Sequence, residues 1–341
     1  MSVVSEPDTS TRGPHRDTGL SIRNLRIGIV HHRGVLEIVR GVDLDVGPGE
    51  KLGVVGESGS GKTLTMLAVL RLLASPPLSV LSGQITYEGE DLLNMDERHL
   101  RAIRGGSIAM VYQDPMSSMN PLLRIGTQIH EALRAHGHDK EYTNARTREV
   151  LEQVGLPDPA RLEAAFPHEL SGGMLQRAMI AMALSTSPRL LIADEPTTAV
   201  DVTIQQQILR LVSDLQATTE MAVVWVTHDL GVIARLVDRV AVMYAGRIVE
   251  EAPTEELFAQ PEHPYTAALL ASLPGPGVAH RGQLHQIGGS PPDPAHLPGG
   301  CPFRVRCPYS FGRCEQEEPG LLDRGPARRA ACWKESSQWT S

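Results

Sequence analysis

The 341-residue sequence has no long apolar run and few aromatic residues. No stretch approaches the roughly 18 apolar residues that a transmembrane helix needs, so no spanning helix is expected. Residues 1–19 are polar, lack the apolar segment of a secretory signal, and are expected to form a disordered tail. These absences predict a cytoplasmic protein, in which any membrane role depends on a partner.

The sequence also lacks an excess of positive charge. Its 40 acidic and 32 basic residues give a net charge of −8, which argues against a broad nucleic-acid-binding surface. Aromatic residues make up only 4%, so the core must consist mainly of aliphatic side chains and Met. The overall composition, 41% hydrophobic and 21% charged, is that of an ordinary globular protein.

Segments typical of strands alternate with segments typical of helices along most of the chain. This alternation predicts an α/β fold with a largely parallel sheet. Residues 114–177 are expected to be mostly helical, and Pro, Gly and Cys become frequent after about residue 261. The expected strands are residues 51–55, 107–112, 190–193, 221–226, 240–244 and 247–250, after a strand-rich start at 20–46.

A glycine-rich loop follows the apolar run at residues 51–55 and precedes a helical pattern. It fits G-x-x-x-x-G-K-[ST] in the strand–loop–helix context of a P-loop, and a chance Gly/Ser turn is the alternative. Glycines let backbone N–H groups face phosphate oxygens, and the helix start adds a positive dipole end. Lys62 is predicted to bind the β- and γ-phosphates of ATP, and the Thr63 hydroxyl to bind Mg²⁺. The predicted loop residues are Gly56, Glu57, Ser58, Gly59, Ser60, Gly61, Lys62 and Thr63.

Two carboxylates follow the apolar strand expected at residues 190–193. Asp194, at the carboxyl edge of a buried strand, has the position that a Walker B aspartate needs to bind Mg²⁺. Glu195 is then placed to polarise the attacking water as a general base. A strand end with two solvated acids is the alternative, which the P-loop in the same chain makes less favourable.

A Leu-Ser-Gly-Gly-Met segment at residues 170–174 opens a helical stretch. Ser171 and the N–H groups of Gly172 and Gly173 could form a second anion site at the helix N-terminus. A simple N-cap is the alternative for this segment taken alone.

The order of these motifs resembles the ATP-binding-cassette (ABC) family over about residues 20–260. Three further residues match that family: Gln113 the Q-loop glutamine, Asp201 the D-loop and His228 the switch histidine. The resemblance implies a P-loop NTPase fold with a mostly parallel core sheet, an antiparallel β subdomain and a helical subdomain at about residues 114–177. Met174 departs from the family's common glutamine, and Ile29 stands near the expected place of the adenine-stacking aromatic, with His31 and His32 nearby.

The resemblance also implies how these residues act. Two cassettes dimerise head to tail, so that Ser171, Gly172 and Gly173 bind the partner's nucleotide. Gln113 contacts Mg²⁺ or the attacking water, and His228 contacts the γ-phosphate. The implied catalytic residues are thus Glu195, His228 and Gln113, the Mg²⁺ ligands are Thr63, Gln113 and Asp194, and Asp201 joins the nucleotide-binding set.

Residues 261–341 resemble the C-terminal extension of oligopeptide/dipeptide and nickel importers. The match includes His-Pro-Tyr at 263–265 and Gly-Gly-Cys-Pro-Phe at 299–303. The resemblance implies an ATPase subunit that drives di- or oligopeptide uptake through two transmembrane permease subunits. A second, distinct ABC ATPase would complete a heterodimer, and an extracytoplasmic binding protein would deliver the substrate. A nickel or small-solute importer of this branch is the first alternative, and a soluble ABC ATPase outside transport is the second.

All four cysteines lie in this extension: Cys301, Cys307, Cys314 and Cys332. A disulfide framework is disfavoured in the cytoplasm, while inert buried thiols are one alternative. Clustered thiols in a segment with little core suggest a metal site, although the spacing lacks the short C-x2-C element typical of zinc. The resemblance implies a structural [4Fe–4S] cluster on these four residues, with zinc as the second choice.

Overall fold

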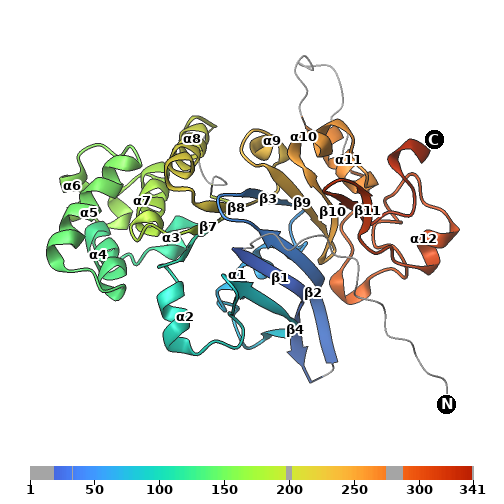
Figure 1. The fold of residues 1–341 in the computed structure, drawn as a ribbon, viewed down its shortest axis with the longest axis horizontal. Coiled ribbons are helices and arrows are strands. Elements are labelled where there is room, and N and C mark those ends of the chain that lie inside the picture. Colours follow the sequence, from blue (N-terminus) through green and yellow to red (C-terminus); the bar gives the residue numbers. More distant parts are fainter. Residues whose placement is uncertain (1–18, 33, 197–201, 274–286, 340–341) are drawn as a thin grey trace.

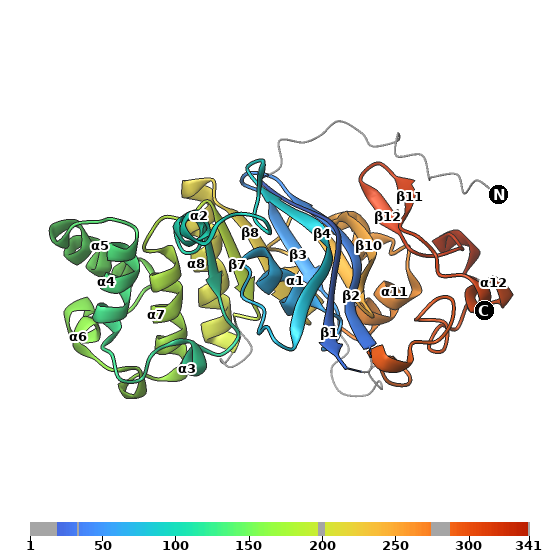
Figure 2. The ribbon, with the colours of Figure 1, turned by 90° about the horizontal axis from the view of Figure 1, so that it is seen from below.

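A computed structural model of the chain describes residues 19–32, 34–196, 202–273 and 287–339. A group of helices lies at one end, two sheets occupy the middle, and the C-terminal residues lie at the other end (Figure 1). The view turned by 90° shows the same order (Figure 2). Apart from Gly19, the predicted tail at residues 1–19 lies outside the described residues.

The larger sheet carries the nucleotide motifs. Its eight strands run in the order β11-β12-β10-β9-β3-β8-β7-β6. The neighbouring strands β9, β3, β8, β7 and β6 pair in parallel. The pairs β9–β10, β10–β12 and β12–β11 are antiparallel. Every residue of β7 and β8 is buried, as expected for parallel strands covered on both faces. The strands are β3 (Lys51–Val55), β6 (Ile108–Val111), β7 (Leu190–Asp194), β8 (Ala222–Thr227), β9 (Arg239–Tyr244), β10 (Arg247–Pro253), β11 (Leu322–Gly325) and β12 (Arg328–Ala330).

The smaller sheet is the antiparallel β subdomain that the resemblance implied. Its strands run in the order β2-β1-β4-β5. Its apolar face packs with α1 (Lys62–Val69) and one face of the larger sheet in a shared core that includes Ile27, Met66 and Val224. The P-loop therefore lies between the two sheets. The strands are β1 (Leu20–His31), β2 (Gly34–Val46), β4 (Leu78–Tyr87) and β5 (Glu90–Asp91).

The helical group forms the far end of the molecule (Figure 1). Aspartates start several of its helices: the Asp114, Asp139 and Asp158 carboxylates each accept a hydrogen bond from a backbone N–H of the first turn. The elements are α3 (Pro115–Ser118), α4 (Ile125–Ala135), α5 (Lys140–Gln153), α6 (Pro159–Ala164), η1 (Pro167–Glu169) and α7 (Gly172–Leu184), with α2 (Glu97–Ile103) preceding them near the smaller sheet.

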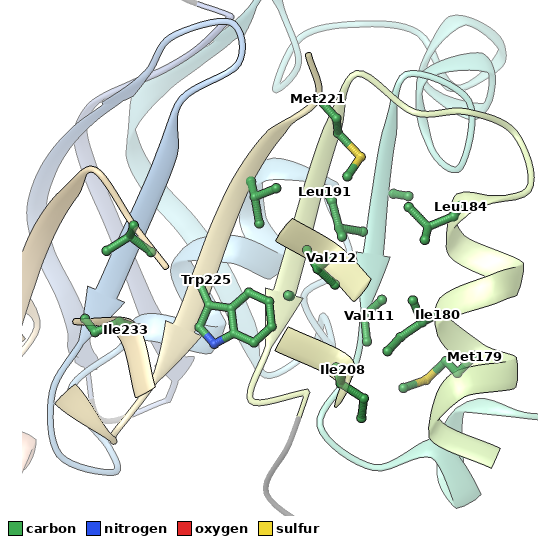
Figure 3. Packing of buried hydrophobic residues seen from close by; sticks show 14 of the residues in the cluster. Val111, Met179, Ile180, Leu184, Leu191, Ile208, Val212, Met221, Trp225 and Ile233 are labelled. Atoms are coloured by element: carbon green, nitrogen blue, oxygen red, sulfur yellow. The ribbon is translucent and has the colours of Figure 1, made fainter. Parts of the chain in front are cut away.

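A second core joins the larger sheet to α7 and α8. Trp225, Leu191 and Val212 pack together there, with Ile180 and Ile208 beside them (Figure 3). The aliphatic core expected from the scarcity of aromatic residues is therefore present around a single Trp in this view. The remaining helices are α8 (Val202–Thr219), α9 (Leu230–Ile233), α10 (Thr254–Ala259), α11 (Pro264–Ala271), η2 (Pro294–His296), α12 (Gly312–Gln316) and η3 (Ser336–Gln338).

The C-terminal extension continues the larger sheet. Strand β12 pairs with β10, and the hairpin partner β11 forms the sheet edge. Phe303 and Tyr265 of the extension belong to the same buried cluster as Tyr244 of β9. The predicted division near residue 261 stays a prediction, but the two parts on either side of it share one sheet and one core.

Candidate active site

The P-loop connects β3 to α1, where the sequence predicted it. Gly56 has φ 155° and Gly61, which precedes α1, has φ 99°. A side chain at Gly56 would place its Cβ 2.2 Å from the backbone oxygen of Met243, so only glycine fits there. The loop can therefore curl closely against the end of β9 and leave its backbone N–H groups for anions.

Lys62 is buried inside this loop, with 5% of its surface exposed. Its Nζ donates to the backbone oxygens of Gly56, at 2.8 Å, and Glu57, at 3.0 Å. Burial lowers the pKa of Lys62, while the carboxylates of Glu195 and Asp194 act in the opposite direction. A partly desolvated ammonium group of this kind interacts strongly with phosphate.

The two predicted Mg²⁺ ligands on β7 and α1 meet. The Thr63 hydroxyl donates to Asp194 Oδ1 at 3.1 Å. Asp194 is only 3% exposed, and burial raises its pKa, opposed by the Thr63 hydrogen bond and the charge of Lys62. A hydroxyl and a carboxylate side by side are hard oxygen ligands, so this pair fits Mg²⁺.

Glu195 brings the three predicted catalytic residues together. Its Oε2 accepts a hydrogen bond from Gln113 Nε2 at 3.0 Å, and its Oε1 lies 3.0 Å from His228 Nδ1. Its backbone has φ 46°, an uncommon conformation for a non-glycine residue, and its N–H donates to the oxygen of Val226 at 2.9 Å. Strain of this kind persists where the surroundings fix it, and functional sites are a common place for it.

The Ser171 segment does not lie with the residues around the P-loop. Ser171 caps α7, with its Oγ accepting a long hydrogen bond of 3.4 Å from the N–H of Met174. Helix α7 belongs to the helical group, whereas α1 and the P-loop lie among the sheets (Figures 1 and 2). The prediction that Ser171, Gly172 and Gly173 bind a partner's nucleotide stays a prediction, and Asp201 lies outside the described residues.

The four cysteines line one cavity together with Phe303, Trp333 and Trp339. None forms a disulfide. Burial raises the pKa of Cys301 to about 12 and that of Cys307 to about 11. Within the described ranges, no group of three or more His, Cys, Asp or Glu side chains is arranged to hold a metal ion, so the metal interpretations stay predictions.

Two side chains that sequence reasoning did not connect with the P-loop contact it. Arg306 and Tyr265, both in the C-terminal extension, bind Glu57. No periodicity or motif links positions so far apart. The signals available in the sequence were that Tyr265 ends the His-Pro-Tyr segment at 263–265 and that Arg306 directly precedes Cys307.

A P-loop, the neighbouring Thr63 and Asp194 side chains and a carboxylate held by Gln113 and His228 are the features predicted for an ATP-hydrolysing cassette. Sequence models agree: the family described as ABC transporter matches residues 39–198, and the oligopeptide/dipeptide transporter C-terminal region matches residues 249–314.

Curated relatives match nearly the whole chain. A probable peptide ABC transporter ATP-binding protein, y4tR of Sinorhizobium fredii, is 46% identical over 94% of this chain and 96% of its own length. The oligopeptide transport protein OppD of Bacillus subtilis is 44% identical over 92% of this chain and 88% of its own length. The dipeptide transport ATP-binding protein DppD of the same organism is 44% identical over 92% of this chain and 94% of its own length.

A solved structure with a similar fold is the dimeric ATP-binding cassette MJ0796 bound to ADP and Pi. It has a TM-score of 0.62 and 26% identity, covering 69% of this chain and 98% of that one. The chain therefore belongs to the ABC transporter ATP-binding proteins, in the oligopeptide/dipeptide importer branch, and it is an ATPase. In the part of the chain that the structure describes, no helix has the length and apolar character needed to cross a bilayer.

Proposed function

We propose that this ATPase drives the uptake of di- or oligopeptides across the cytoplasmic membrane. The observation that carries the proposal is the combination of the ATPase site with a C-terminal region that matches the oligopeptide/dipeptide transporter model. The relatives named above are described as peptide, oligopeptide and dipeptide transport proteins and match the chain nearly end to end.

The site supports a direct hydrolytic mechanism. Lys62 binds the β- and γ-phosphates. Thr63, Asp194 and Gln113 would hold Mg²⁺, which would neutralise phosphate charge. Glu195 accepts the proton of the attacking water. The hydrogen bonds from Gln113 and His228 orient the Glu195 carboxylate. In the proposed mechanism Gln113 also contacts Mg²⁺ or the attacking water, and His228 contacts the γ-phosphate.

Assembly completes this mechanism. Ser171, Gly172 and Gly173, at the start of α7, bind the nucleotide held by a second, related cassette, with Asp201 at the same interface. Two transmembrane permease subunits anchor the cassettes to the cytoplasmic face of the membrane, and an extracytoplasmic binding protein supplies the peptide. The position of Ser171 on a helical group away from this chain's own P-loop supports a role toward a partner.

The cysteine cavity is the proposed site of a structural [4Fe–4S] cluster, with zinc as the alternative. The support is that Cys301, Cys307, Cys314 and Cys332 line the same cavity. Iron, acid-labile sulfide and zinc analysis of anaerobically purified protein, together with its visible absorption, distinguishes the two. Protein that contains neither metal and is fully stable would contradict both.

Reconstitution tests the transport proposal. The chain, its partner cassette, the permeases and the binding protein are placed in proteoliposomes, and uptake of labelled peptides and of Ni²⁺ is measured with ATP inside. We expect ATP-dependent peptide uptake that Glu195→Gln abolishes. Uptake of Ni²⁺ alone would favour the nickel importer, and failure to purify with any permease would favour a soluble ABC ATPase.

A further inference from the structure

The C-terminal extension holds the P-loop through an ion pair. Arg306 follows Glu57 by 249 positions, yet its Nη1 donates to Glu57 Oε2 at 2.7 Å and its Nη2 to Glu57 Oε1 at 2.8 Å. The Arg306 side chain is 5% exposed and that of Glu57 is 25% exposed. This is the bidentate geometry in which guanidinium–carboxylate pairs are strongest and most directional.

A second contact fixes the main chain of the same P-loop residue. The backbone N–H of Glu57 donates to the Tyr265 hydroxyl at 2.8 Å. Tyr265 is fully buried on α11, with its ring 4.6 Å from that of Tyr244 and 5.5 Å from that of Phe303. Glu57 is thus held by its carboxylate and by its N–H, and both partners belong to the extension.

Arg306 is itself held in place. Its Nε donates to the oxygen of Gly288 at 2.9 Å, and its Nη1 also reaches the Tyr244 hydroxyl at 3.3 Å. Its guanidinium lies 5.8 Å from the Tyr244 ring centre and 5.9 Å from that of Phe303. A cation with this many fixed contacts behaves as part of the core, unlike the mobile partners of a surface salt bridge.

Glu57 connects these contacts to the phosphate-binding lysine. The backbone oxygen of Glu57 accepts a hydrogen bond from Lys62 Nζ. Movement of Glu57 would therefore move one of the two carbonyl groups that position the Lys62 ammonium. The extension also approaches the loop at a second place, because Pro291, Pro292 and Leu297 line a cavity whose other wall includes Ser58, Gly59 and Ser60.

We propose that Arg306 and Tyr265 are positioning residues of the ATPase, which hold Glu57 so that the P-loop is shaped for phosphate before the nucleotide arrives. Preorganisation of a binding loop increases affinity because less ordering is needed on binding. Both residues act on Glu57 and, through its backbone oxygen, on Lys62. In this proposal the contacts from the extension therefore affect the affinity for nucleotide more than they affect the rate of phosphate cleavage.

Single substitutions and a double-mutant cycle test this. Tyr265→Phe removes only the hydroxyl, and Arg306→Gln and Glu57→Gln each break the ion pair. Arg304→Gln is the matched control, because Arg304 lies in the same turn but bonds to Gly299 within the extension. The dissociation constant for ADP is measured by calorimetry on the purified full-length chain, and KM and kcat for ATP on the assembled transporter.

We expect Tyr265→Phe to raise the ADP dissociation constant about two- to tenfold, and Arg306→Gln by about tenfold or more, with kcat within about twofold of wild type. The double variant of Glu57 and Arg306 should bind ADP no more weakly than the weaker single variant, since both remove the same pair. Arg304→Gln should leave binding unchanged.

A role limited to folding would lower thermal stability, but it would not raise KM while leaving kcat unchanged. If a folded Arg306→Gln protein binds ADP within twofold of wild type, or if the two substitutions of the ion pair add independently, the proposal is wrong. Should Arg306→Gln fail to fold, Tyr265→Phe decides: unchanged ADP binding in that variant overturns the proposal.

Discussion

Glu195→Gln tests the assignment of the general base. The substitution preserves the size and planarity of the side chain and removes its basicity. In the structure one oxygen of Glu195 accepts from Gln113 Nε2 and the other lies 3.0 Å from His228 Nδ1. The variant amide retains one oxygen acceptor, and Gln113 can present its own oxygen to the new amide group after a rotation of its side-chain amide.

The expected loss follows from comparing two effects. A general base contributes about 10²- to 10⁴-fold to a rate, which corresponds to about 2.7–5.4 kcal/mol of transition-state stabilisation. Weakening one hydrogen bond among these three side chains costs only about 0.5–1.5 kcal/mol, which corresponds to about two- to tenfold in rate. A fall in kcat of a hundredfold or more therefore requires the loss of the base.

Phosphate release by the assembled transporter at saturating Mg-ATP measures kcat, and calorimetry with ADP measures binding. Because Lys62, Thr63 and Asp194 are unchanged, we expect the ADP affinity to stay within about threefold of wild type. Glu152→Gln, at an exposed position of α5, is the matched control. A Glu195→Gln protein that keeps more than about a tenth of the wild-type rate would refute the assignment.

Three other predictions concern Mg²⁺, the shared core and pH. Thr63→Ala should raise the Mg²⁺ concentration for half-maximal ATPase activity about ten- to hundredfold, because the hydroxyl next to Asp194 is lost; an unchanged Mg²⁺ titration would contradict this. Phe303→Ala, at a residue 2% exposed, should cost about 3–5 kcal/mol in urea unfolding, and a cost below about 1 kcal/mol would show that the extension is not part of the core. Burial raises the pKa of Glu250 from its ordinary 4.5 to about 7, so the folded state binds more protons than the unfolded state between these values, and this contribution to stability is lost as pH rises through that window. Burial lowers the pKa of His263 to about 3, so His263 makes stability rise with pH between about pH 3 and 6.5. The check that isolates Glu250 is therefore the unfolding free energy of wild type minus that of Glu250→Gln, which should fall from pH 4.5 to 7.5.

Much of the site could be predicted because its residues stand at the ends of recognisable strands. The apolar runs at residues 51–55 and 190–193 are short and buried, and parallel pairing brings their carboxyl ends to one edge. This is why the sequence alone was enough to assign Lys62, Asp194 and Glu195 to one site. Gln113 and His228 were assigned from the resemblance to the ABC family, and both lie within hydrogen-bonding distance of Glu195.

Other features carry no local signal. The pairing of β12 with β10 joins Ala330 to Glu250, and the strand at residues 328–330 is too short for its pattern to stand out. The φ of 46° at Glu195 comes from its surroundings, since no residue type at that position demands it. The contact of Arg306 with Glu57 depends on how the extension folds back, which composition and motifs do not determine.

The position of the aromatic cluster explains why the extension and the nucleotide site should respond together. Tyr244 ends β9, the neighbour of the P-loop strand β3, and its ring lies 4.6 Å from that of Tyr265 and 5.3 Å from that of Phe303. Displacement of Phe303 would therefore disturb Tyr265 and Arg306 at once, and with them both contacts of Glu57. Phe303→Ala is accordingly expected to weaken ADP binding as well as stability, whereas an equally destabilising substitution in the helical group, such as Leu133→Ala, should leave ADP binding by the folded protein unchanged. Equal loss of ADP affinity in both variants would mean that general destabilisation, and not the route through Glu57, controls the nucleotide site.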